Sequence, residues 1–172
     1  MKIKGMNYDV GIQFEFGNPV TVNNHFSEER MKKDFDIIKN ELGCTAVRLS
    51  GTDVDEIIRG SELVLQAGLD CWVSPHYIDA PIDIVEEQTL ECARRSEELR
   101  KKYPENEVVF IYGCEMHHFA PFLPGNSFME RLASIATPGA VEGATAKLNE
   151  YFARTIPELR KVFKGRVTYC TV

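Results

Sequence analysis

The chain has 172 residues, of which 44% are apolar, and its formal net charge is −6 with a pI near 5.3. A chain of this length and composition is typical of one domain with a sizeable core. Its net negative charge gives no positive potential that would attract a phosphate backbone, which argues against nucleic acid or an anionic membrane as a partner. We read neither a signal peptide in the opening residues nor a segment long enough to span a bilayer, so we expect a cytoplasmic protein.

Five segments have the composition of strands. The fourth is a continuous β-branched and aromatic run, which is typical of a strand buried on both faces of a parallel sheet. Trp72, the only tryptophan, lies in the middle of the third, and we expect it to pack between sheet and helix. The predicted strands cover residues 2–8, 44–49, 69–74, 107–112 and 166–172.

Helical spacing of apolar residues predicts helices in the four crossovers between these strands. Polar caps mark their starts, and Gly or Pro marks their ends. Pro157 should kink the last helix. An irregular loop holding Gly17, Pro19 and His25 follows the first strand. The predicted helices cover residues 27–43, 53–68, 81–102, 127–136 and 144–163.

The alternating order of strands and helices predicts an α/β fold with a parallel sheet. A complete eight-stranded barrel needs roughly 250 residues. We therefore predict that residues 1–172 form one (β/α) domain of the TIM-barrel type, as the N-terminal five-strand portion of a barrel. An open doubly wound sheet is the alternative. A partial barrel exposes two edges and an inner face, so we expect a homodimer or a missing C-terminal half-barrel to cover them.

The five cysteines are odd in number and lack CxxC spacing. Four of them fall in predicted strands or just after one, which indicates small buried thiols of a reduced protein. They are Cys44, Cys71, Cys92, Cys114 and Cys170.

The end of the fourth strand carries the strongest functional signal. Apolar residues give way to Gly113 and Cys114 and then to the ionisable Glu115, His117 and His118. Loops at the carboxyl ends of barrel strands carry the chemistry of such folds, so Glu115 is our candidate for the functional centre. The two histidines are adjacent, and in an extended loop they would point in opposite directions, so at most one should reach the site.

Several segments resemble a known bacterial group. They are residues 1–9, 44–51 and 67–75, together with the Glu115 segment and residues 122–125. The chain resembles proteins identified as abortive infection proteins, which have a glycoside-hydrolase-like barrel. The resemblance implies a TIM-barrel fold and a link to defence against phage.

More distantly, the layout is similar to the retaining glycosidases of the large barrel clan A. That resemblance maps Arg48 onto the arginine closing the second strand, His76 onto a polar residue after the third, and Glu115 onto the general acid/base. Cys114 stands where the clan has Asn, and the clan's nucleophilic Glu lies on a seventh strand. The resemblance thus implies a carbohydrate-like or other small-molecule ligand, with no cofactor or metal.

Retaining hydrolysis requires two carboxyl groups about 5–5.5 Å apart. Glu115 supplies one, and an apolar mouth containing Tyr112, Phe119 and Phe122 should raise its pKa. No residue at a strand end is an obvious second carboxyl group, and Asp9 is only the nearest candidate by position. We therefore expect that these residues alone do not hydrolyse glycosides. The expected ligand-binding residues are Asn7, Asp9, Tyr112, His117 and His118.

Three other interpretations remain open. Glu115 could simply form an ion pair with Arg48 that orders the barrel opening, with His76 as an ordinary loop histidine. His76, Glu115 and one of His117 or His118 could instead hold a divalent metal in a barrel related to sugar isomerases or phosphoesterases, although no HxH or HExxH spacing occurs. The third interpretation is a non-catalytic interaction module of a defence system.

Overall fold

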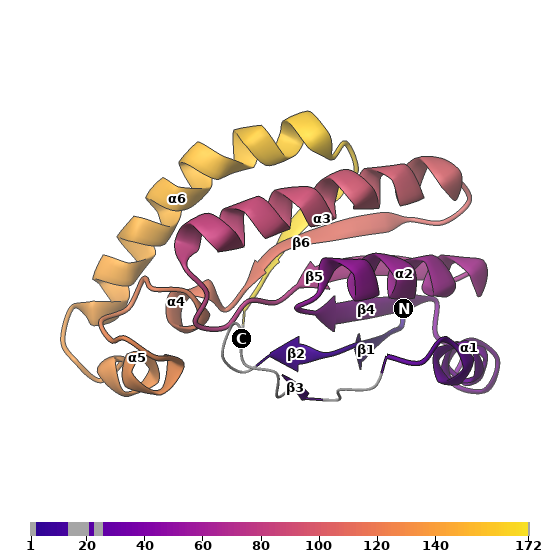
Figure 1. Cartoon of the computed structure of the whole chain (residues 1–172), viewed down its shortest axis with the longest axis horizontal. Helices are drawn as coiled ribbons and strands as arrows, with labels where there is room; N and C mark the ends of the chain where they lie inside the picture. Colours follow the sequence, from indigo (N-terminus) through magenta and orange to yellow (C-terminus); the bar gives the residue numbers. More distant parts are fainter. Residues whose placement is uncertain (1–2, 14–20, 23–25, 172) are drawn as a thin grey trace.

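The computed structural model describes residues 3–13, 21–22 and 26–171 (Figure 1). The loop predicted around Gly17, Pro19 and His25 lies outside the described residues. No helix within these ranges has the length and apolar character needed to cross a membrane.

Five parallel strands form the central sheet, which confirms the predicted α/β class. Their order in the sheet is β1-β4-β5-β6-β7, with β1 and β7 at the edges. A separate antiparallel pair, β2 (Ile12–Gln13) and β3 (Thr21–Val22), was not predicted. The strands of the main sheet are β1 (Gly5–Asp9), β4 (Ala46–Gly51), β5 (Asp70–Pro75), β6 (Val108–Cys114) and β7 (Arg166–Cys170).

Several helices begin at the expected caps, whereas the last helix begins at Ala140, four residues before its predicted start. Ser27 accepts a hydrogen bond from the backbone N–H of Arg30, and Asp53 accepts two from the first turn of the second helix. The helices are α1 (Glu28–Asp36), continued by a π-helical turn (Ile37–Glu41), α2 (Val54–Gln66), α3 (Ile82–Lys102), α4 (Met116–Phe119), α5 (Phe128–Ser134) and α6 (Ala140–Val162).

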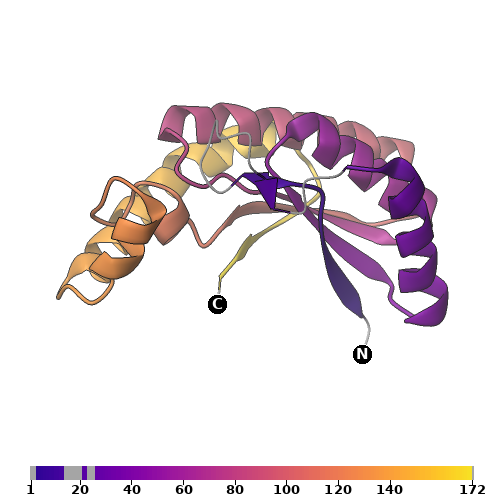
Figure 2. The same cartoon turned by 60° about the horizontal axis from the view of Figure 1, so that its bottom comes forward.

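The strands follow one another across the sheet in chain order. In the described part of the chain there is no reversal of this order, which is the feature that defines a doubly wound sheet. Figures 1 and 2 show the long helices α2, α3 and α6 gathered on one side of the sheet, while the termini lie on the other. The arrangement argues against the doubly wound alternative.

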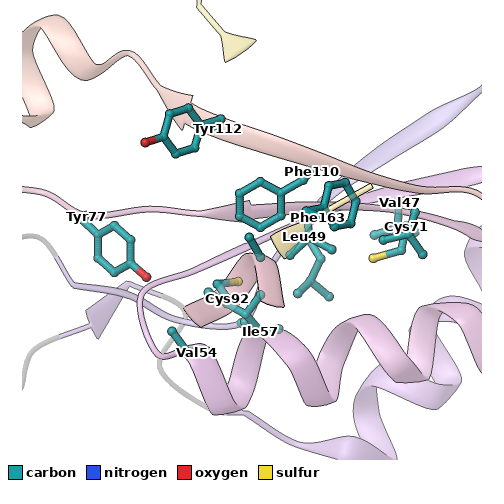
Figure 3. Packing of buried hydrophobic residues seen from close by; sticks show 14 of the residues in the cluster. Val47, Leu49, Val54, Ile57, Cys71, Tyr77, Cys92, Phe110, Tyr112 and Phe163 are labelled. Atoms are coloured by element: carbon teal, nitrogen blue, oxygen red, sulfur yellow. The ribbon is translucent and has the colours of Figure 1, made fainter. Parts of the chain in front are cut away.

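The core lies between the sheet and these helices. Alternate residues of each strand point into it, among them Leu49, Val73 and Phe110, each 0% exposed. Phe110 packs against Phe163 with ring centroids 5.6 Å apart, and Figure 3 shows the two rings side by side above Ile57 of α2. Burial of this apolar surface is the main stabilising contribution to the fold.

The other residues of the strands form the inner face of the sheet. One row across it runs from Asn7 through Arg48, Trp72 and Val109 to Arg166, because these residues are partners in the strand ladders. Trp72 alternates with Cys71 and Val73, which belong to the core, so it lies on the inner face. The expectation that Trp72 packs between sheet and helix is therefore wrong.

Candidate functional site

An extra residue in β6 shapes the carboxyl end of the sheet. Ile111 is paired with Thr168 and Cys114 with Cys170, so three steps along β6 correspond to two along β7. This is a β-bulge, and it brings Cys114 into register with the inner-face residues of β7. Gly113 takes up the bulge with a φ of 93°, where a Cβ atom would collide with the sulfur of Met116.

Glu115 follows the bulge directly and has a left-handed backbone conformation, with a φ of 45°. Such a conformation is unfavourable for a glutamate and requires support from its surroundings. The support is visible on β7, where the carbonyl oxygen of Cys170 accepts a hydrogen bond from the Glu115 N–H at 2.9 Å. The hydroxyl of Tyr169 likewise accepts one from the Met116 N–H at 2.9 Å.

The carboxylate of Glu115 lies 3.1 Å from Nε2 of His118. Both side chains are partly exposed, at 20% and 19%. His118 lies on α4, a single helical turn that was not predicted, and Glu115 is the N-cap residue just before it. His117 points elsewhere, with Nε2 3.2 Å from Oγ1 of Thr145. His118, but not His117, therefore belongs to the site.

Arg48 enters the site from β4. Its Nε and Nη2 atoms donate to Oγ of Ser74 at 3.3 and 3.2 Å. Among the described residues Glu115 forms no ion pair with Arg48, since the only ion-pair partner of its carboxylate there is His118. The ion-pair interpretation of these two residues is therefore wrong.

His76 completes the group just beyond β5. Burial lowers its pKa to about 4, with a further lowering from Arg48 and an opposing effect from Glu115. The imidazole is therefore neutral near pH 7. Its ring packs on Phe119 with centroids 4.7 Å apart, and neither ring nitrogen has a hydrogen-bond partner among the described residues. A cavity of about 20 Å³ beside it has room for a single water molecule.

A buried ion pair holds α4 in place. The guanidinium of Arg131, a residue 2% exposed, binds the carboxylate of Asp79 and donates to the carbonyl oxygens of His118 and Phe119 at 2.6 and 3.1 Å. Asp79 has a φ of 59° and also accepts from the Phe128 N–H. Sequence reasoning missed this pair, because an arginine in a short polar helix looks like a surface residue.

The predicted aromatic mouth is only partly present. Tyr112 is 3% exposed and points toward the helices, where it stacks on Tyr151. Phe122 also packs on Tyr151. Tyr112 therefore faces the helices and not the inner face, and Phe119, beside His76 and His118, is the aromatic group that reaches the site.

Asn7 and Asp9 lie on the edge strand β1, paired with Arg48 and Ser50. Asn7 borders a hollow of about 260 Å³ on the inner face, together with Arg48 and Trp72. Three strand spacings separate β1 from β6, which amounts to about 14 Å along the sheet. This separation is too large for Asp9 and Glu115 to form the close carboxyl pair, about 5–5.5 Å, of a retaining glycosidase.

The metal interpretation receives no support from the arrangement of side chains. In the described ranges, no three His, Cys, Asp or Glu residues come together in a way that could hold a metal ion. His117 is turned to α6, away from Glu115 and His76. His76 and Glu115 therefore form no ligand set with either His117 or His118.

The chain matches no model of a known protein family. A search of curated proteins likewise found no match. The resemblance to abortive infection proteins and to clan A glycosidases therefore stays a prediction, and the site has to be interpreted from its own residues.

Proposed function

We propose that the inner face of the sheet binds a carbohydrate-like ligand at the carboxyl ends of β4, β5 and β6, with Glu115 as its acid/base group. The observation that carries the proposal is the convergence of Arg48, His76 and Glu115 on one edge of the sheet, with Glu115 in an unfavourable backbone conformation. Strain of this kind clusters at ligand and catalytic sites.

Each group has a role suited to a polyhydroxylated ligand. Glu115 donates a proton to a leaving oxygen or accepts one from a hydroxyl, while His118 orients its carboxyl group from 3.1 Å away. Arg48 supplies donors to ligand hydroxyl groups. His76, neutral near pH 7, lines the site without adding a charge, since both of its ring nitrogens are buried.

The same proposal treats residues 1–172 as one (β/α) domain and the sheet as part of a TIM-type barrel. Strands in chain order with their helices on one face are the arrangement of a barrel segment. The remaining strands of the barrel then come from a C-terminal half-barrel or from a second copy of the chain. The second carboxylate comes from there too, so these residues by themselves bind the ligand without hydrolysing it.

The test uses the fluorescence of Trp72, the sole tryptophan, which borders the inner-face hollow. The chain is titrated with a panel of iminosugars of gluco, galacto and manno configuration, whose protonated nitrogen pairs with a carboxylate. We expect a saturable change in fluorescence that Glu115→Gln weakens about tenfold or more, since a charge-assisted hydrogen bond is worth about 1.5–3 kcal/mol.

The matched control is Glu150→Gln, which removes the same charge from an exposed position on α6. It should leave the titration unchanged. The proposal fails if no member of the panel gives a saturable change, or if the two variants bind equally well.

A further inference from the structure

The carboxyl ends of β6 and β7 bring two cysteines side by side. Cys114 and Cys170 are the last residues of these strands and are partners across the parallel ladder. Both thiols are free and partly exposed. The expectation that all five cysteines are buried is therefore wrong for these two.

Their spacing fits a disulfide. Neighbouring strands lie about 4.7–4.9 Å apart, and a disulfide joins residues whose Cα atoms are about 4.4–6.8 Å apart. Cys170 lies on the same side of β7 as Thr168, opposite to Val167 and Tyr169, which pack against the core. The bulge in β6 turns Cys114 to this same inner face, so the two side chains point in one direction.

The electrostatic coupling of the thiols supports this proximity. Burial raises the pKa of Cys114 to about 11, Arg48 acts in the opposite direction, and the thiol of Cys170 raises the pKa further. Because Cys114 is protonated near pH 7, it is a poor nucleophile for a first attack. Cys170 lies on the edge strand β7, where a small disulfide can approach, so exchange begins there.

We propose that Cys114 and Cys170 form a dithiol that small-molecule disulfides oxidise reversibly to an intramolecular disulfide. The Cys170 thiolate attacks one sulfur of the small disulfide, forming a mixed disulfide and releasing one thiol. The sulfur of Cys114 loses its proton, attacks the Cys170 sulfur and releases the second thiol. Two protein thiols are oxidised, one small disulfide is reduced, and the protons of the protein thiols pass to the released thiols.

The remaining cysteines provide an internal control. Cys71 and Cys92 are 0% exposed and Cys44 is 5% exposed, so a small disulfide does not reach them in the folded chain. The inference is independent of the proposed ligand site, although oxidation would tie the backbone just before Glu115 to β7.

The experiment exposes the folded chain to oxidised glutathione at pH 7.5. The reaction is stopped with acid, and the remaining thiols are alkylated in denaturant and counted by intact mass. We expect two of the five thiols to be lost without a retained glutathione, peptide mapping to link Cys114 to Cys170, and dithiothreitol to restore all five. Mapping needs no variant, so the test does not depend on whether a variant folds.

Two substitutions check the order of the steps. Cys114→Ser should stop at a stable mixed disulfide on Cys170, whereas Cys170→Ser should keep all four remaining thiols. Cys44→Ser, as the matched control, should still form the disulfide. Retention of all five thiols in the unmodified chain, or a disulfide linking any other pair, would overturn the proposal.

Discussion

The two faces of the sheet are built from alternate residues of the same strands, yet they differ in how closely their side chains are packed. On the helix side, Leu49, Val73 and Phe110 are fully buried, and each fills a defined space in the core. On the inner side the neighbours Arg48 and Trp72 are partly exposed. Packing against the helices thus stabilises the fold on one face and leaves the other free to carry polar groups at its carboxyl edge.

The largest difference between the faces should appear on truncation of a core residue. Phe110→Ala leaves a cavity beside Phe163 and should lower the free energy of unfolding by about 3–5 kcal/mol. Thr168→Ala, on the exposed inner side of β7, should change it by no more than about 0.5 kcal/mol. Urea unfolding of both variants measures the contrast, and equal losses would show that the inner face also carries the core.

A smaller effect, which depends on pH, should come from His76 at the edge of the inner face. Its pKa is about 4 in the folded chain and near 6.5 in the unfolded one, so the unfolded state binds more protons between these values. Its contribution to stability is therefore complete above pH 6.5 and is lost as the pH falls to 4. The loss amounts to at most roughly 3 kcal/mol.

His76→Asn should remove this part of the pH dependence, as measured by urea unfolding at several pH values between 4 and 7. His117→Asn is the matched control, because His117 is more open to solvent and its pKa is lowered less by burial. If both variants show the same dependence of the free energy of unfolding on pH as the unmodified chain, protonation of the buried His76 is not the cause of that dependence.

The smallest effect separates the backbone of Glu115 from its carboxylate. Glu115→Gly and Glu115→Ala both remove the side chain, but only glycine adopts a φ of 45° without strain. The glycine variant should therefore be more stable than the alanine variant by about 1 kcal/mol, while neither binds an iminosugar. Thermal unfolding measures the difference, and an alanine variant as stable as the glycine variant would mean that the position is not strained.

Most of the fold followed from local patterns in the sequence. Buried apolar runs predicted the strands, and caps such as Ser27 and Asp53 predicted where helices begin. The short elements were missed because α4 and the β2–β3 pair are too small to show a period. Strands of continuous apolar residues also give no contrast between faces, which is why the orientations of Trp72 and Tyr112 were predicted incorrectly.

The site was predicted by position and missed in its supports. Glu115 was proposed because ionisable residues at the carboxyl ends of parallel strands carry the chemistry of such folds, whereas Arg48 and His76 were proposed from the resemblance to glycosidases. The contact between Glu115 and His118 depends on α4, and α4 depends on the buried pair of Arg131 and Asp79. That pair joins residues 52 positions apart, a separation at which no local pattern operates.

Because of the bulge in β6, the carboxyl edge of the sheet should tolerate substitutions better than a change in the length of the strand. Loss of one residue between Ile111 and Cys114 would restore the regular ladder with β7 and rotate the end of the strand by one side-chain alternation. Glu115 would then turn toward the helices and away from Arg48, although every residue of the core would be kept. A chain with such a deletion would retain the architecture and lose the site.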